Sequence, residues 1–147
     1  MADARAYPDR PFLAVSAAIV RDGKVLIVRR DRPPAKGVYT LPGGLVEAGE
    51  TLIDAVTREV REETALTIAP VALAGHREVI TQDPDGRFER HFVILCFASQ
   101  FISGTPVAND EIAEILWLDP AELAGLRTTE GLAEIVDSAF EVLKAVT

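Results

Sequence analysis

The order of hydrophobic and polar residues predicts a chain made mostly of strands, with one helix in its middle and one at its end. Runs rich in β-branched and aromatic residues, bounded by turn residues, predict extended segments at 12–21, 24–30, 38–41, 67–80, 87–101 and 115–118. Asp22-Gly23 joins the first two runs, as in a hairpin. A basic, proline-rich loop is predicted at 29–37, and Gly75 interrupts the fourth run.

Helical periodicity marks the remaining elements. Residues 52–64 contain good helix formers and neither proline nor glycine. Near the C-terminus, apolar residues at helical spacing predict an amphipathic helix, and they are Leu132, Ile135, Val136, Ala139, Phe140, Leu143 and Val146. Asp119-Pro120 can begin a short helix before it. Strands with one inserted and one terminal helix suggest a mixed sheet with helices on both faces.

Three glutamates of the central helix lie close to its apolar face. At about 100° per residue, Glu59, Glu62 and Glu63 share roughly a 100° arc. Glu63 falls inside the apolar arc and Glu59 at its edge, and that arc is formed by Leu52, Ile53, Val56 and Val60. Burying an unpaired carboxylate is costly or raises its pKa, and a bound divalent cation removes this cost. Oxygen ligands favour Mg²⁺ or Mn²⁺ over Zn²⁺.

The segment 44–66, GLVEAGETLIDAVTREVREETAL, places these glutamates in a longer pattern. It resembles the box of the Nudix family, G-x5-E-x7-R-E-U-x-E-E-x-G-U, in which U is aliphatic. The matching residues are Gly44, Glu50, Arg58, Glu59, Val60, Glu62, Glu63 and Leu66. Ala65 stands where the family has its second glycine, and alanine in a left-handed conformation there costs roughly 1 kcal/mol. Gly43-Gly44 is expected to permit unusual backbone angles.

The resemblance implies a fold and a reaction. Nudix proteins are α/β/α sandwiches with a mixed sheet, and the resemblance covers roughly residues 12–143. It implies that the box helix lies on one face and the C-terminal helix on the other. Nudix enzymes typically hydrolyse a nucleoside diphosphate linked to another moiety, with Mg²⁺ as the implied cofactor and Mn²⁺ also possible. Such chemistry depends on positioning and charge neutralisation.

By position, the resemblance also implies roles for the residues of the box. The metal ligands expected from it are Glu59, Glu62, Glu63 and the carbonyl group of Gly44. Glu59 and Glu63 are the main ones, while Glu62 shares a metal or acts through bound water. Arg58 is expected to orient a ligand carboxylate, and Glu50 to stabilise the junction between loop and helix.

The general base of this family often lies outside the box. The acidic run 108–114 contains Glu111, which is the first candidate, with Asp110 and Glu114 as alternatives. The expected catalytic residues are Arg58, Glu62, Glu63 and Glu111.

Basic and aromatic residues outside the box are candidates for substrate contacts. The first four are Arg29, Arg30, Tyr39 and Arg90. Arg29 leads because it ends a strand beside the predicted cleft. Further cations are Arg32, Lys36, Arg77 and His91, and Phe12, Phe88 and Phe92 could stack on a base or pack in the core. His76 has no special context.

The composition favours a single compact domain and argues against membrane-spanning, secreted and nucleic-acid-binding proteins. A chain of 147 residues with 48% hydrophobic residues fits one compact domain, predicted at 11–147 after a flexible tail at 1–10. No apolar run is long enough to span a membrane, and the N-terminus lacks a secretory signal. The lone Cys96 indicates a reducing, cytoplasmic compartment. The net charge of −8 argues against nucleic-acid polymers as partners. A homodimer is an expectation from the family.

The wider pattern is similar to the bacterial Nudix group described as ADP-ribose pyrophosphatase-like. It comprises RRDRPPAKGVYTLPGGLVEAGETL, the later Asp-Gly turn, HFVILCF and the acidic loop. The expected substrate is therefore ADP-ribose or a similar nucleotide sugar. A nucleoside-triphosphate pyrophosphohydrolase that sanitises the nucleotide pool is an alternative. A non-catalytic, nucleotide-sensing module is another, but the full set of box carboxylates favours an enzyme.

Overall fold

A computed structural model describes residues 3–33 and 35–146, so the predicted tail at 1–10 and the loop at 29–37 are described without residues 1–2 and 34. The elements in chain order are β1 (Phe12–Arg21), β2 (Lys24–Arg30), β3 (Tyr39–Thr40), β4 (Gly43–Leu45), α1 (Leu52–Thr64), β5 (Thr67–Gln82), β6 (Phe88–Ser103), β7 (Ile112–Leu118), the 3-10 helix η1 (Pro120–Gly125) and α2 (Leu132–Ala145). Among the described residues, no helix is long and apolar enough to cross a membrane.

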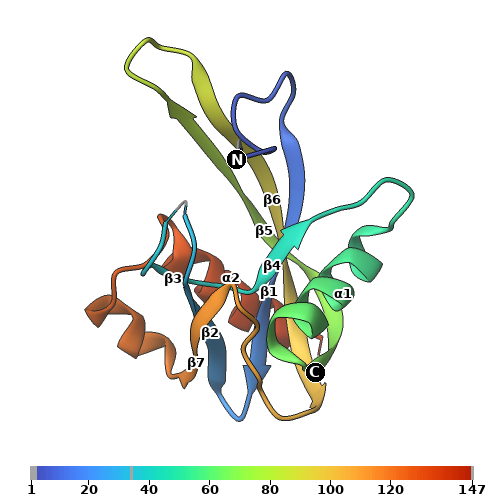
Figure 1. The fold of residues 1–147 in the computed structure, drawn as a ribbon. Helices are drawn as coiled ribbons and strands as arrows, with labels where there is room; N and C mark the ends of the chain where they lie inside the picture. Colours follow the sequence, from blue (N-terminus) through green and yellow to red (C-terminus); the bar gives the residue numbers. More distant parts are fainter. Residues whose placement is uncertain (1–2, 34, 147) are drawn as a thin grey trace.

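The strands form a single mixed sheet. Its main order is β3-β2-β1-β6-β5, with β4 also paired to β1 and β7 also paired to β2. β1 and β6 run parallel, and the other pairs are antiparallel. β5 and β6 form a long hairpin whose tip projects beyond the body of the molecule (Figure 1). A register shift between Leu73 and Gly75 bears out the interruption predicted there.

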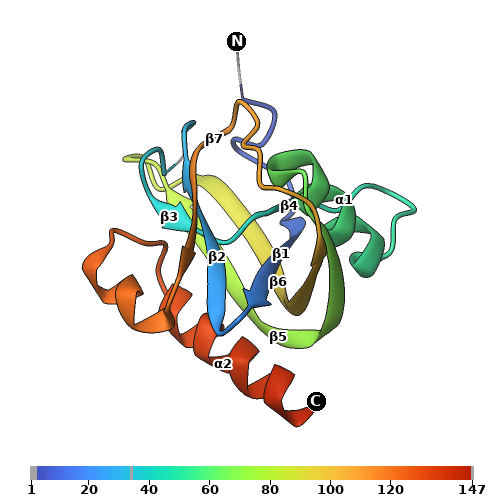
Figure 2. The same cartoon turned by 90° about the horizontal axis from the view of Figure 1, so that it is seen from below.

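The two helices cover opposite faces of this sheet (Figures 1 and 2). Alternate residues of β1 belong to two separate cores, because successive side chains of a strand point to opposite faces. Val15 and Ile19 pack with Val56 and other residues of α1, whereas Ala18 packs with residues of α2. The predicted α/β/α sandwich is confirmed.

The segment before α1 differs from the prediction. The strand expected at 38–41 is limited to Tyr39–Thr40, and Gly43–Leu45 forms the separate strand β4 against β1. Neither Gly43 nor Gly44 has a positive φ, so the expectation of unusual backbone angles is wrong. A Cβ atom on Gly43 would overlap the carbonyl oxygen of Val15. These glycines are therefore needed for close approach rather than for conformational freedom.

Helix α1 begins and ends at recognisable caps. The side chain of Thr51 accepts a hydrogen bond of 3.1 Å from the Asp54 N–H, which satisfies one free donor of the first turn. At the other end Ala65 is left-handed, with φ +66°, and its N–H donates to the Arg61 carbonyl at 2.9 Å. Ile53, expected on the apolar face, is 43% exposed, because the buried face is rotated towards Ala55.

The left-handed Ala65 generates a stability prediction. Ala65→Gly is expected to raise the free energy of unfolding by about 1 kcal/mol, because glycine adopts this conformation without a steric clash. Ala133→Gly, at an exposed position in the first turn of α2, is the matched control and should lower stability, because glycine is a poorer helix former than alanine. Urea unfolding of both variants checks that the free energy of unfolding rises in Ala65→Gly and falls in Ala133→Gly. A loss of stability in Ala65→Gly would contradict the prediction.

Candidate active site

Glu63 carries its carboxylate into the space between α1 and β4. The residue is only 5% exposed, and its Oε1 accepts a hydrogen bond of 2.7 Å from the Gly43 N–H. Burial raises the pKa of this carboxyl to about 8, although the Gly43 bond acts in the opposite direction. The placement expected from the helical wheel, with an acid on the apolar face, is observed.

Glu59 lies one helical turn before Glu63 and is also largely buried, with 16% of its side chain exposed. Burial raises the pKa of its carboxyl, and the nearby Arg58 guanidinium lowers it in part. Gly44 faces this carboxylate directly, because a Cβ atom at that position would overlap the Glu59 side chain. The absence of a side chain at Gly44 therefore leaves room for the Glu59 carboxylate against β4.

Arg58 joins the carboxylates of the box into one network. Its Nε and Nη2 donate to the two carboxylate oxygens of Glu50, at 2.6 and 2.8 Å. Its Nη1 donates to Glu59 at 2.8 Å and to Glu62 at 3.2 Å. A fourth partner of the guanidinium is the Leu45 carbonyl, which accepts a hydrogen bond of 3.1 Å from Nη2. The Arg58 guanidinium, helped by the Glu47 N–H, lowers the pKa of Glu50 to about 2.

The acidic loop before β7 is anchored to the end of α1. The N–H of Asn109 donates to the Glu63 carbonyl at 3.2 Å, and the Asn109 side chain accepts from the Glu111 N–H at 2.9 Å. Burial is the largest cause of the raised pKa values of Glu59 and Glu63. The negative charge of the Glu111 carboxylate is a smaller cause that raises both. Glu111 is therefore the acid of this loop whose charge acts on both buried glutamates.

The other two acids of the loop have partners elsewhere. Asp110 accepts a hydrogen bond of 2.7 Å from Arg32 and is 80% exposed. Glu114 accepts a hydrogen bond of 2.6 Å from the Tyr39 hydroxyl, and the Nε of Arg29 lies 3.7 Å from the same carboxylate oxygen. Arg32 is shared between two of the acids, because its Nη1 also lies 3.8 Å from Oε1 of Glu111.

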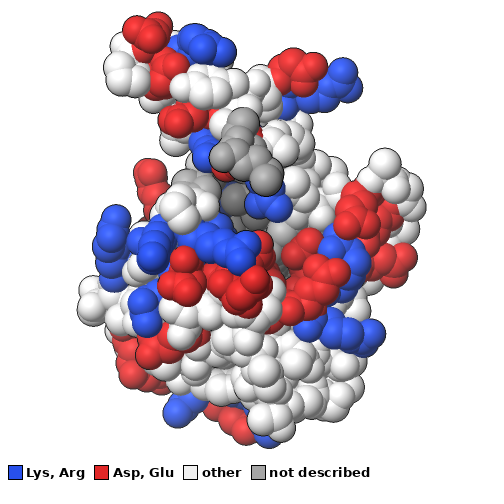
Figure 3. Space-filling model, viewed as in Figure 1, with Lys and Arg blue, Asp and Glu red and all other residues white. Residues whose placement is uncertain are grey.

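The donor set around Glu59 and Glu63 fits a hard divalent cation. Two desolvated carboxylates, the more exposed Glu62 and the adjacent Gly44 supply only oxygen ligands, which suit Mg²⁺ or Mn²⁺. Within residues 3–33 and 35–146, no three carboxylate, imidazole or thiolate side chains are already gathered closely enough to enclose an ion. Figure 3 shows acidic and basic side chains intermingled around α1, so metal binding would compete with Arg58 for these carboxylates.

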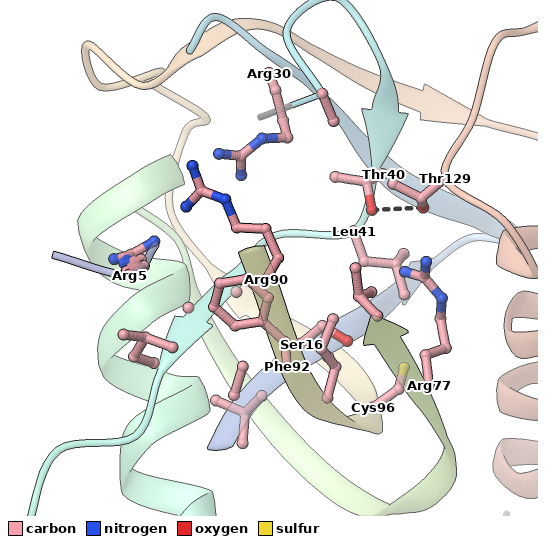
Figure 4. Close-up of a pocket in the computed structure, with 18 of the residues that line it drawn as sticks. Arg5, Ser16, Arg30, Thr40, Leu41, Arg77, Arg90, Phe92, Cys96 and Thr129 are labelled. Atoms are coloured by element: carbon pink, nitrogen blue, oxygen red, sulfur yellow. Dashed lines mark hydrogen bonds between the residues drawn. The ribbon is translucent and has the colours of Figure 1, made fainter. Parts of the chain in front are cut away.

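A cavity of about 460 Å³ opens beside the two glycines of β4. Its walls are largely apolar and include Leu41, Val79, Phe92, Ile94, Leu132 and Ile135. Four arginines also line it, namely Arg5, Arg30, Arg77 and Arg90 (Figure 4). Arg30 lies near enough to Glu63 to lower the pKa of that carboxyl. The cavity therefore combines apolar walls with positive charge next to the buried carboxylates.

The predicted substrate contacts divide between this cavity and its surroundings. Arg30, Arg90 and Phe92 line it, whereas Arg29 and Tyr39 are joined to Glu114 outside its lining. Arg30 rather than Arg29 lines the cavity, and the pairing of β2 with β7 is irregular between these two residues.

Of the remaining candidates, Arg77 lines the cavity, whereas Arg32, Lys36, His91, Phe12 and Phe88 are not among its lining residues. Lys36 and Phe88 are exposed, and Phe12 stacks on Phe92 with ring centroids 6.0 Å apart. His76 is exposed, and its Nε2 lies 3.7 Å from Glu78.

Some lining residues carried no signal in the sequence. Arg5 lies in the predicted tail, and Thr40 and Thr129 come from distant segments whose hydroxyl groups are hydrogen-bonded at 2.9 Å. Cys96 lines the cavity as a buried thiol, and burial raises its pKa to about 11, so it stays uncharged at neutral pH. Only the folded sheet brings these residues together.

The buried Glu63 generates a prediction about pH. Its carboxyl titrates near 4.5 when unfolded and near 8 when folded, so between these values the folded protein binds a proton that the unfolded chain has released. The free energy of unfolding of the metal-free protein should therefore fall as the pH rises from about 5 to 8. Urea unfolding in EDTA should show this slope, and Glu63→Gln should flatten it. The exposed Glu134→Gln is the control and should leave it unchanged. If the pH dependence of the free energy of unfolding is the same in Glu63→Gln as in the wild type, the raised pKa is not that of Glu63.

Comparison with known proteins agrees with this geometry. Residues 10–139 match the family model of the NUDIX domain. A protein of Methanocaldococcus jannaschii named ADP-ribose pyrophosphatase is 38% identical over 109 residues, which are 74% of this chain and 62%, less than two thirds, of that relative. A Mycobacterium tuberculosis protein named putative 8-oxo-dGTP diphosphatase 2 is 37% identical over 76% of this chain and 75% of its own length.

The structural comparison leads to the same family. The crystal structure of a MutT NUDIX hydrolase from Burkholderia pseudomallei superimposes with a TM-score of 0.75 and 27% identity, over 88% of this chain and 98% of that one. The buried glutamates of α1, the glycines that face them and the match over residues 10–139 lead to one conclusion. The chain belongs to the Nudix family of hydrolases.

Proposed function

We propose that this hydrolase cleaves the phosphoanhydride bond of a nucleoside diphosphate linked to another moiety, with ADP-ribose or a similar nucleotide sugar as the first candidate. Mg²⁺, or Mn²⁺ in its place, is the proposed cofactor. The observation that carries the proposal is the pair of desolvated carboxylates, Glu59 and Glu63, beside a cavity lined by arginines. Buried acids next to a cationic cavity suit the binding of metal ions together with phosphate groups.

The residues of the box would hold the metal and keep it in place. Glu59 and Glu63 are the proposed main ligands, with Glu62 and the Gly44 carbonyl as further ones. When bound, the ion would neutralise phosphate charge and lower the pKa of water. Arg58 fixes the Glu59 carboxylate at 2.8 Å and is itself fixed by Glu50. It is therefore proposed as a positioning residue.

Glu111 is proposed to accept the proton of the attacking water. Its carboxylate acts electrostatically on both Glu59 and Glu63, and its backbone is held by Asn109 and by the Asp31 N–H, 2.9 Å from the Glu111 carbonyl. Half of its side chain is exposed, which leaves it access to a water molecule. Asp110 accepts a direct hydrogen bond from Arg32, which stays 3.8 Å from Glu111, and Glu114 accepts one from Tyr39, so both are weaker candidates.

The substrate preference is supported by the cavity and by a relative. Guanidinium groups bind phosphate oxygens in a fixed, two-pronged geometry, and apolar walls suit a base or a sugar ring. The archaeal relative with 38% identity is named an ADP-ribose pyrophosphatase. The mycobacterial relative with 37% identity is named a putative 8-oxo-dGTP diphosphatase, which keeps a nucleoside-triphosphate pyrophosphohydrolase as the second candidate. Oligomeric state, including the expected homodimer, stays a prediction.

A hydrolysis screen tests the proposed function. Purified protein would be incubated with Mg²⁺ or Mn²⁺ and ADP-ribose, other nucleotide sugars, or nucleoside triphosphates including oxidised ones. AMP with ribose 5-phosphate is the expected product pair from ADP-ribose. Glu59→Gln should lower kcat by about 10²-fold or more, the scale of losing electrostatic stabilisation. The exposed Glu134→Gln is the control with full activity. A nucleoside monophosphate with pyrophosphate would move the protein to the second candidate, and no turnover despite tight binding would favour a sensor.

A second comparison tests the general base. Glu111→Gln should lower kcat by about 10²-fold or more, within the range of general-base catalysis, with an unchanged melting temperature. Asp110→Asn, the neighbouring acid held by Arg32, should keep a near-wild-type kcat. If Asp110→Asn is instead the damaging change, the assignment of Glu111 is wrong.

A further inference from the structure

The N-terminal strap, defined as residues 3–10, is attached to the β5–β6 hairpin. The N–H of Tyr7 donates to the Glu89 carbonyl at 2.8 Å, and its hydroxyl donates to Asp83 at 2.9 Å. The guanidinium carbon of Arg87 lies 4.3 Å from the centre of the Tyr7 ring. Tyr7 also has a φ of +52°, which is unfavourable for a residue with a side chain. These contacts of Tyr7 therefore hold the strap against the β5–β6 hairpin.

The strap brings an acid to one arginine of the cavity. Oδ2 of Asp3 lies 2.6 Å from Nη1 of Arg90, whose side chain is only 15% exposed. This nitrogen is buried, and the pair lacks the alignment of a hydrogen bond, so Nη1 has no hydrogen-bond partner among the described residues. The Arg5 N–H, followed by Arg90, lowers the pKa of Asp3, so its carboxyl is charged at neutral pH. Arg90 is therefore neutralised by an imperfectly placed partner.

Asp3 stands apart from the other residues that line the cavity. It is the acidic residue among those that the structure describes there, and four arginines accompany it. Figure 4 shows Arg30 and Arg90 at one end of the cavity and Arg77 on the side of α2. Removal of the Asp3 carboxylate would leave Arg90 buried and uncompensated, a costly state unless another anion replaces it. Asp3 itself is 42% exposed, so its carboxylate can move into water.

We propose that Arg90 is a subsite for a phosphate group of the substrate, and that Asp3 occupies it as an internal competitor until the substrate displaces it. The proposal rests on the proposed function for its substrate and adds a residue that tunes affinity. A phosphate offers several oxygens to both ends of the guanidinium and can align with Nη1, which Asp3 does not. Neutral ligands cannot displace the carboxylate, so the strap would favour anionic ones. Arg5, on the same strap, adds positive charge beside the incoming anion.

A double-mutant cycle tests the competition. Binding of inorganic pyrophosphate would be measured by calorimetry in EDTA, so that neither metal binding nor hydrolysis enters. Asp3→Asn should tighten binding by roughly threefold to tenfold, the scale of a partly exposed ion pair. Asp9→Asn removes an equal charge from an exposed position of the strap outside the cavity lining and is the matched control. It should leave the affinity unchanged.

Arg90→Gln completes the cycle. It should weaken pyrophosphate binding, and Asp3→Asn should then give no further gain, because its effect acts through Arg90. Weaker binding in Asp3→Asn alone would mean that Asp3 positions Arg90, which overturns the proposal. If Asp3→Asn tightens pyrophosphate binding equally with and without Arg90, the effect is one of net charge only, and the proposal is overturned as well. If the protein hydrolyses ADP-ribose but the effects of Asp3→Asn and Arg90→Gln on pyrophosphate binding are independent, only this inference is rejected. If the two effects depend on each other but no nucleotide is hydrolysed, only the proposed function is rejected.

Discussion

The guanidinium group of Arg58 is the interaction on which the arrangement of the site depends. It binds the loop through Glu50, the end of β4 through the Leu45 carbonyl and α1 through Glu59. The group is planar and permanently charged, so it can hold these acceptors only in one relative orientation. It also places positive charge next to Glu59, which would otherwise face the like charge of Glu62 without compensation. The geometry of the box thus follows from one cation with several anionic partners.

Close packing between α1 and β4 is the second constraint. Glu63 can bond to the Gly43 N–H only because the strand passes directly under the helix, and Gly44 leaves the volume that the Glu59 carboxylate needs. A hydrophobic core usually excludes such groups, yet Val56 and Val60 pack on the same helix face. The helix therefore combines burial that stabilises the fold with burial that leaves two acids poorly solvated.

Local patterns in the sequence were sufficient for the helix and its acids, because the periodicity of an α-helix fixes which side chains share a face. The position of Glu63 on the apolar side could be predicted in this way. The strand β4 could not, because it has only three residues and forms by pairing with β1, a segment distant in the sequence. The same holds for Arg5, which reaches the cavity through the contacts of the strap. Pairing between Tyr39 and Glu114 likewise depends on β7 lying beside β2.

The parallel pairing of β1 with β6 also has a consequence for how the molecule is made. Phe12 lies opposite Phe92, so this pair joins segments separated by the box, α1 and the whole of β5. Contacts between such distant segments form slowly, because a long stretch of chain must be closed first. On the ribosome, α1 and the first hairpin emerge well before β6 and α2 do. The nascent chain therefore cannot complete its sheet until β6 has emerged, and until then the edge of β1 that pairs with β6 stays exposed.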